Sequence, residues 1–167
     1  MRRGLAAAGI TTALVLGPIA CGTAVLSKDT VASSVQTQLQ GKGVQVENMK
    51  CPSDLEAVVG RSMRCEFTTG GQPVDAVVTV TSVEGTTARY DVHTEARPVA
   101  KALLSQKVAE LIGQQAGVTV DSSTCSGDLP PTVGGTVSCS LRSGTDTADF
   151  TVTVTSIDGG LVNFSIE

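Results

Sequence analysis

The sequence predicts an α+β fold of two tandem repeats, each with one helix packed on a four-stranded antiparallel sheet and one disulfide. Three observations predict this class. Residues 43–93 align with residues 117–167 without a gap and with 17 identities in 51 positions. In each copy a helical apolar period gives way to strict alternation. Two cysteine pairs share a spacing of 14 positions, Cys51 with Cys65 and Cys125 with Cys139.

The N-terminal segment, residues 1–27, is predicted to be a signal peptide or membrane anchor. Arg2 and Arg3 precede a 24-residue uncharged run from Gly4 to Ser27, as export signals do. Three fates remain open. Lipidation of Cys21 with cleavage before it would account for the fifth cysteine, which is left over from the two pairs. Pro18, however, is unusual in a lipoprotein signal. An uncleaved helix would be long enough for about 30 Å of hydrocarbon, and cleavage with release is the third. In the first two, the rest of the chain faces outward.

Composition after the signal excludes several functions. From Lys28 onward the chain has 10 basic and 16 acidic residues, a formal net charge of −6. Such a surface repels nucleic acid and anionic lipid headgroups. The chain has no Trp, one Tyr and three Phe, so stacking sites for bases or sugars are not expected.

Each repeat is expected to begin with a helix. Val31, Val35 and Leu39 recur on one helical face, and Ser27 or Asp29 could cap its start. The second copy repeats the stripe at Leu104, Val108, Leu111 and Ile112.

Strands are expected after each helix. A glycine, Gly43 or Gly117, starts a short strand over residues 44–46 or 118–120. Alternating residues then predict three more strands per copy, joined by hairpin turns at Gly70-Gly71, Glu84-Gly85, Gly144 and Asp158-Gly159. The Thr-rich outer face is expected to be solvated. The inward residues are Met63, Cys65, Phe67, Ala76, Val78, Val80, Ala88, Tyr90 and Val92, and in the second copy Val137, Cys139, Leu141, Phe150, Val152, Val154, Val162, Phe164 and Ile166.

The repeats are assigned to residues 28–95 and 96–167, with residues 94–98 as a short linker of limited swing. Units of this size bury little apolar area and usually need a staple. Four cysteines could instead bind zinc, but structural zinc ligands usually lie two to four residues apart. Disulfides are therefore predicted within each pair, with Cys65 facing the core.

No constellation of catalytic residues is present, so an enzyme, a metal site and a cofactor are not expected. His93 is the only histidine and falls on the outer face. Asp54 and Asp128 recur as Cys-x-x-Asp-Leu and are expected to accept hydrogen bonds from nearby backbone in a turn. Gly60 and Gly134 are expected to adopt positive φ.

The segment Cys51-Pro-Ser-Asp-Leu-Glu-Ala-Val-Val-Gly-Arg-Ser-Met-Arg-Cys65, followed by Val-Thr-Val-Thr-Ser-Val-Glu-Gly85, closely resembles the family called "domain of unknown function 4333". The resemblance covers the chain twice from about Lys28. It implies an actinobacterial envelope lipoprotein or membrane-anchored protein with disulfides, and no activity. The second copy departs at Ser126 and at Pro130-Pro131, so its cysteine loop is expected to be stiffer and non-helical.

The expected function is a non-catalytic extracytoplasmic module, held at the outer face of the plasma membrane by a lipid or an N-terminal helix. It would bind an envelope protein or wall component through strand edges or cysteine loops, and duplication would raise its effective concentration. The alternative is a carrier for a lipid or small ligand in a pocket between helix and sheet.

Overall fold

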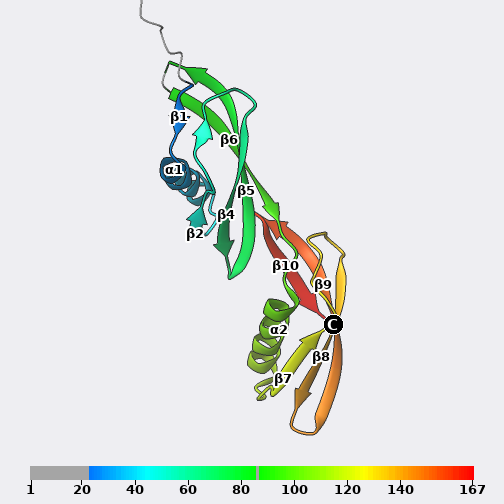
Figure 1. Ribbon diagram of the computed structural model, residues 1–167. Coiled ribbons are helices and arrows are strands. Elements are labelled where there is room, and N and C mark those ends of the chain that lie inside the picture. Colours follow the sequence, from blue (N-terminus) through cyan, green and yellow to red (C-terminus); the bar gives the residue numbers. More distant parts are fainter. Residues whose placement is uncertain (1–22, 86) are drawn as a thin grey trace, which may run out of the picture.

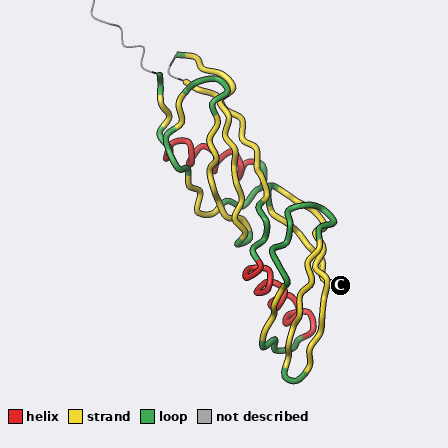
Figure 2. The backbone as a smooth tube through the Cα atoms, turned by 45° about the vertical axis from the view of Figure 1, so that its right-hand side comes forward, coloured by secondary structure: helices red, strands yellow, loops and turns green. Residues whose placement is uncertain are grey.

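The computed structural model describes residues 23–85 and 87–167. It shows two helix-and-sheet units following one another along the chain (Figures 1 and 2). The prediction of a lipid on Cys21 and that of a membrane anchor fall largely outside the described residues. No helix in the described ranges is both long enough and apolar enough to cross a bilayer.

The first repeat contains one helix, a four-stranded antiparallel sheet and a short two-stranded one. The four-stranded sheet has the order β2-β4-β5-β6, and β1 pairs with β3. The elements are β1 (Val25–Leu26), α1 (Lys28–Gly41), β2 (Glu47–Lys50), β3 (Leu55–Glu56), β4 (Ser62–Thr69), β5 (Gln72–Glu84) and β6 (Thr87–Ala96).

The second repeat has a helix followed by a four-stranded sheet in the corresponding order β7-β8-β9-β10. A single bridge between Val99 and Leu129 stands where β1 and β3 pair in the first repeat. The β1–β3 pair and this bridge were not predicted. The elements are α2 (Lys101–Ala116), β7 (Ser122–Cys125), β8 (Thr136–Ser143), β9 (Asp146–Asp158) and β10 (Leu161–Ile166).

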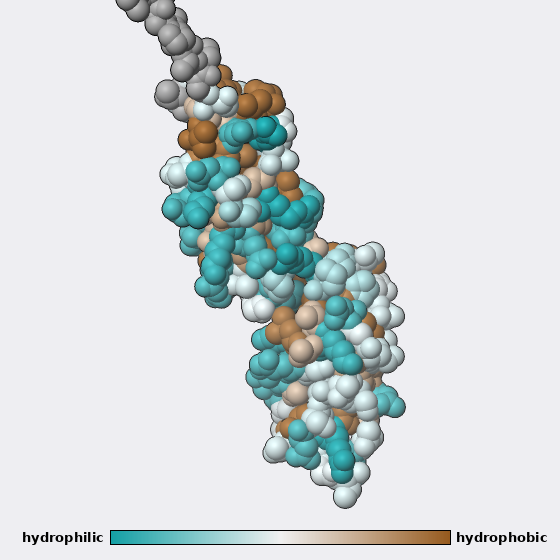
Figure 3. All heavy atoms as spheres, viewed as in Figure 1, coloured by the Kyte–Doolittle hydropathy of each residue, from teal (hydrophilic) through white to brown (hydrophobic). Residues whose placement is uncertain are grey.

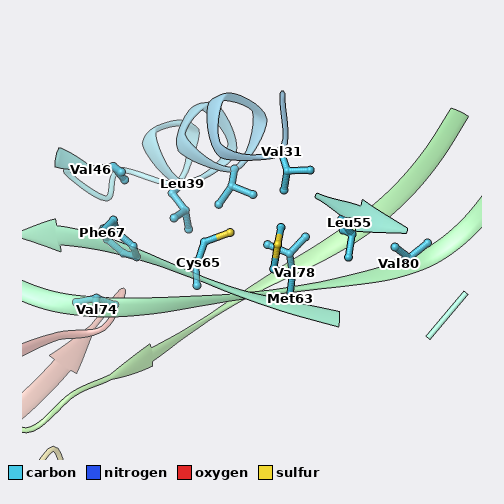
Figure 4. Close-up of a cluster of buried hydrophobic side chains, with 12 residues drawn as sticks. Val31, Leu39, Val46, Leu55, Met63, Cys65, Phe67, Val74, Val78 and Val80 are labelled. Carbon is cyan, nitrogen blue, oxygen red and sulfur yellow. The ribbon is translucent and has the colours of Figure 1, made fainter. Parts of the chain in front are cut away.

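Each repeat has its own core. In the first, Val31, Val35 and Leu39 of α1 pack against the inward residues of β4 and β5, and Phe67 is fully buried (Figure 4). Leu104 and Val108 are the buried positions of α2 in the second core. The predicted helical stripe and strand alternation therefore identify most of both cores. Residues that the outermost strands were expected to bury are only half-buried, among them Tyr90, Val92 and Phe164.

The predicted strands over residues 44–46 and 118–120 are wrong, because β2 begins at Glu47 and β7 at Ser122. The end of α1 gives the reason in the first repeat. Gly43 adopts φ 84°, and the N–H of Val44 donates to the carbonyl of Leu39 at 3.0 Å. These residues complete the helix C-terminus and satisfy its last carbonyls, so they cannot join the sheet.

The expected linker is also shorter than predicted. Strand β6 continues to Ala96, which pairs with Val74 of β5. Only Arg97 and Pro98 separate β6 from Val99, whose N–H and carbonyl both bond to Leu129 of the second repeat. The connection is therefore fixed on both sides.

Candidate binding surface

Both predicted disulfides are present. Cys51, directly after the edge strand β2, bonds to Cys65 of β4, and Cys125 of the edge strand β7 bonds to Cys139 of β8. Cys65, Cys125 and Cys139 are buried and Cys51 is half-buried. Disulfides of this kind persist in oxidising compartments outside the cytoplasm.

Asp54 and Asp128 accept hydrogen bonds from backbone, but not in the local turn that was predicted. The N–H of Lys28 donates to Asp54 Oδ1 at 2.9 Å, and the N–H of Lys101 donates to Asp128 Oδ1 at 2.7 Å. Each aspartate therefore caps the helix of its own repeat from 26 or 27 residues away. A carboxylate there also complements the positive end of the helix dipole. The recurring Cys-x-x-Asp motif is thus structural.

Removing the Asp128 carboxylate should cost more than removing that of Asp54. Helix α1 is also capped by the Ser27 hydroxyl, whereas Ala100 provides α2 with no side-chain cap. We expect Asp128→Ala to lower the free energy of unfolding by about 1 kcal/mol, and Asp54→Ala by less. Urea denaturation of both variants measures the difference, and an equal loss would contradict the assignment.

The outer face of the first sheet carries an ion network rather than a merely solvated surface. Asp75 is 7% exposed and lies between Arg64 and Arg97, at 2.9 and 3.1 Å. Arg64 also pairs with Glu95, and Arg97 with Glu66. Hydrogen bonds to Glu95 and then to Asp75 raise the pKa of Arg64 above its ordinary value. The network ties β4, β5 and β6 to the start of the connection.

The second repeat supplies a natural control for this network. Asp149 occupies the position of Asp75 but is exposed. We expect Asp75→Asn to cost about 1–3 kcal/mol, because it weakens the pairing of two arginines at a largely buried position. Asp149→Asn should change stability by less than about 0.5 kcal/mol. Thermal unfolding of both variants decides the comparison, and equal effects would refute a role for the network.

A groove of about 670 Å³ lies between α1 and β6 in the first repeat. One face of α1 supplies Thr30, Ser34 and Gln38, while Ala88 and Tyr90 on the strand side are half-buried against the core. The groove exists because α1 lies closest to β2, at the opposite edge of the sheet. The side chains that α1 contributes to the groove are polar, and those that β6 contributes are partly apolar.

Strand β6 forms an open edge beside this groove. It spans ten residues, and among the described residues no strand pairs with its outer side. Alternate N–H and C=O groups of an edge strand point outward and can pair with another chain. The side chains on the outer face of the sheet along β6 are Arg89, Asp91, His93 and Glu95, which are one basic, two acidic and one histidine residue. His93 is exposed, as predicted.

The second repeat differs at the corresponding places. Leu103, Lys107 and Leu111 stand where the first helix has its three groove residues, and Leu103 packs against the second core. Strand β10 has six residues instead of ten. Its outward groups at Val162 are already bonded to Gln72 of the first repeat. The groove between the helix and the last strand, and the long free edge, therefore belong to the first repeat.

This contact through Gln72 joins the two repeats. The Gln72 amide donates to the Val162 carbonyl and accepts from the Val162 N–H, both at 3.0 Å and both buried. The side chain thus replaces a neighbouring strand. Asp146 stands at the equivalent position of the second repeat and is exposed.

Two glycines in the β9–β10 turn complete the junction. A Cβ at Gly160 would lie 2.2 Å from Val74 Cγ1, and one at Gly159 would lie 2.7 Å from Val44 Cγ2. Backbone of the second repeat therefore packs directly on valines of the first.

The predicted positive φ is present at Gly60 and Gly134, at 85° and 82°, where each precedes a strand.

Sequence reasoning missed the groove, the junction and the ion network. Each of the three depends on residues that differ between the copies, such as Gln38, Gln72 and Arg64, whereas the predictions relied on positions where the copies agree. Comparing the helices position by position would have shown Thr, Ser and Gln in one copy against Leu, Lys and Leu in the other. No group of three or more His, Cys, Asp or Glu side chains suited to a metal occurs within residues 23–85 and 87–167.

These features define an α+β tandem repeat in which each copy holds one disulfide. The copies have diverged: the last strand of the first repeat has an open edge, whereas that of the second is bonded to the first repeat. A family model matches residues 9–85 and again residues 90–159. The chain belongs to that family, described as "Domain of unknown function (DUF4333)". Searches of curated proteins and of solved structures gave no match.

Proposed function

We propose that the chain is a non-catalytic binding module outside the cytoplasm, anchored to the outer face of the plasma membrane through residues 1–27. The anchor would be a lipid on Cys21 or the apolar run itself as a helix. Two observations support this location: the two disulfides, and the pair Arg2 and Arg3 that precedes the apolar run.

The single observation that carries the binding role is the open edge of β6 beside the α1–β6 groove. An extended segment of an envelope protein would add as a further strand, with main-chain hydrogen bonds supplying affinity. Every second side chain of that segment would lie over Ala88 and Tyr90, facing the small polar residues of α1. The others would meet the charged side chains of Arg89, Asp91 and Glu95 on β6, which favours a segment that carries complementary charges.

Position-specific photo-crosslinking tests this proposal. A photo-crosslinking amino acid replaces Ser34 in the full chain in its own cells, and the control carries it at Lys107, the equivalent position in α2. We expect Ser34 to form an adduct with one defined polypeptide and Lys107 to form none. Thr30→Leu with Gln38→Leu introduces the residues of the second repeat and should abolish the adduct. Equal adducts at both positions, or adducts that survive groove closure, would refute the site.

The carrier function has one observation in its favour. A groove of about 760 Å³ lies between α2 and β7, and the nearby Ser123 hydroxyl is buried without a partner among the described residues. The groove is open to solvent, and the space between helix and sheet is filled by core side chains. We therefore favour the strand-addition proposal. A ligand that shifts the amide resonances of residues 120–124 but not those of β6 would reverse this preference.

A further inference from the structure

The end of the first repeat nearest the N-terminal segment exposes three valines. Val25, Val58 and Val59 are 56%, 44% and 62% exposed. They are held together because Val25 pairs with Glu56, and the N–H of Ala57 donates to the carbonyl of Ala24 at 2.8 Å. Hydrophobic residues gather at this end of the first repeat (Figure 3). We call these three side chains the valine tip.

The second repeat has no equivalent cluster. Its alignment places Pro98 where the first repeat has Val25, and Thr132 where it has Val58. Only Val59 has an apolar counterpart, Val133, and it is exposed to the same 62%. One exposed valine is thus common to both copies, and the other two are specific to the copy that follows the N-terminal segment.

The position of the tip restricts what can cover it. Val25 lies three residues after Gly22, so its Cα is within about 11 Å of that residue even for an extended chain. The run from Gly4 to Gly22 contains no charged residue. Two charged side chains close to the tip in the chain, Glu56 and Arg61, pair with each other. An anchor in a bilayer would therefore bring the tip to the membrane surface.

We propose that the valine tip contacts the bilayer, at the boundary between headgroups and acyl chains. This inference rests on the proposed anchoring and deepens it. Apolar side chains at this depth stabilise membrane contact through buried area. Because this contact depends on apolar area, it does not require electrostatic attraction between the acidic repeats and anionic headgroups. The contact would hold the first repeat against the membrane and fix the orientation of β6 relative to the surface.

Tryptophan fluorescence tests the contact, because the chain contains no Trp. The full chain carrying Val59→Trp is purified from cell membranes and reconstituted in phosphatidylcholine vesicles, with and without lipids brominated in the acyl chains. Val133→Trp is the matched control at the same exposure. We expect Val59→Trp emission to shift to shorter wavelength and to be quenched by brominated lipid, and Val133→Trp emission to be unaffected. Adding Val25→Thr and Val58→Thr to the Val59→Trp variant should weaken the quenching.

Flotation of the same vesicles separates the two proposals. A chain that floats with the vesicles but shows no quenching of Val59→Trp, or equal quenching of Val133→Trp, overturns the tip contact and leaves the anchoring intact. A chain that is absent from the membrane fraction overturns the anchoring itself and the tip contact with it.

Discussion

Replacing both cysteines of either bridge with alanine should lower the free energy of unfolding by about 3 kcal/mol, the loop-entropy value for a closed loop of about 15 residues. Each bridge closes a loop with a sequence separation of 14. The second bridge should matter more, because Cys125 and Cys139 are both buried, whereas Cys51 is half-buried. Truncating it therefore also leaves unfilled space in the core.

Guanidinium denaturation of the two double variants measures these losses. Reduction of the wild-type chain is an independent check, since it should destabilise the protein in the same direction without any substitution. If each double variant lost less than about 1 kcal/mol, the bridges would not be the staples that such small units require.

Breaking the junction should have the second large effect. Gln72→Ala leaves the N–H and the carbonyl of Val162 buried without partners, and each such group costs about 1–3 kcal/mol. Gly160→Ala should be at least as damaging, because the new Cβ would overlap Val74 and the residue must keep φ 94°. We expect the two repeats of each variant to unfold in separate thermal transitions.

The control is Asp146→Ala, which alters the exposed counterpart of Gln72. It should leave a single transition at the wild-type temperature. Small-angle scattering of Gln72→Ala should show a broader distribution of molecular dimensions than that of the wild type. An unchanged single transition in both junction variants would show that the contact does not couple the repeats.

Periodic patterns predicted the parts of the fold that depend on one helix or one hairpin. Val31, Val35 and Leu39 identified the buried side of α1, and the alternation of Met63, Cys65 and Phe67 identified that of β4. Glycines at Gly70, Gly85, Gly144 and Gly159 located the hairpin turns, because a tight turn needs positive φ.

Features that depend on distant partners could not be predicted in this way. Asp54 was expected to bond locally, but its partner is the helix start 26 residues earlier. The start of β2 was misplaced because closure of the helix C-terminus takes up Gly43 and Val44. Gln72 belongs to no periodic pattern, because its role depends on a hydrogen bond to Val162, which lies 90 residues further along the chain.

We expect the edge of β6 to be paired in the envelope and free in the purified protein. Hydrogen exchange by mass spectrometry, on the chain in native envelope fractions and after purification, tests it most directly. We predict slower exchange in the envelope for residues 87–96, no change for residues 122–125 of β7, and loss of the difference in the Thr30→Leu, Gln38→Leu variant. Equal exchange of residues 87–96 in both preparations, or protection of β7 in their place, would contradict the account.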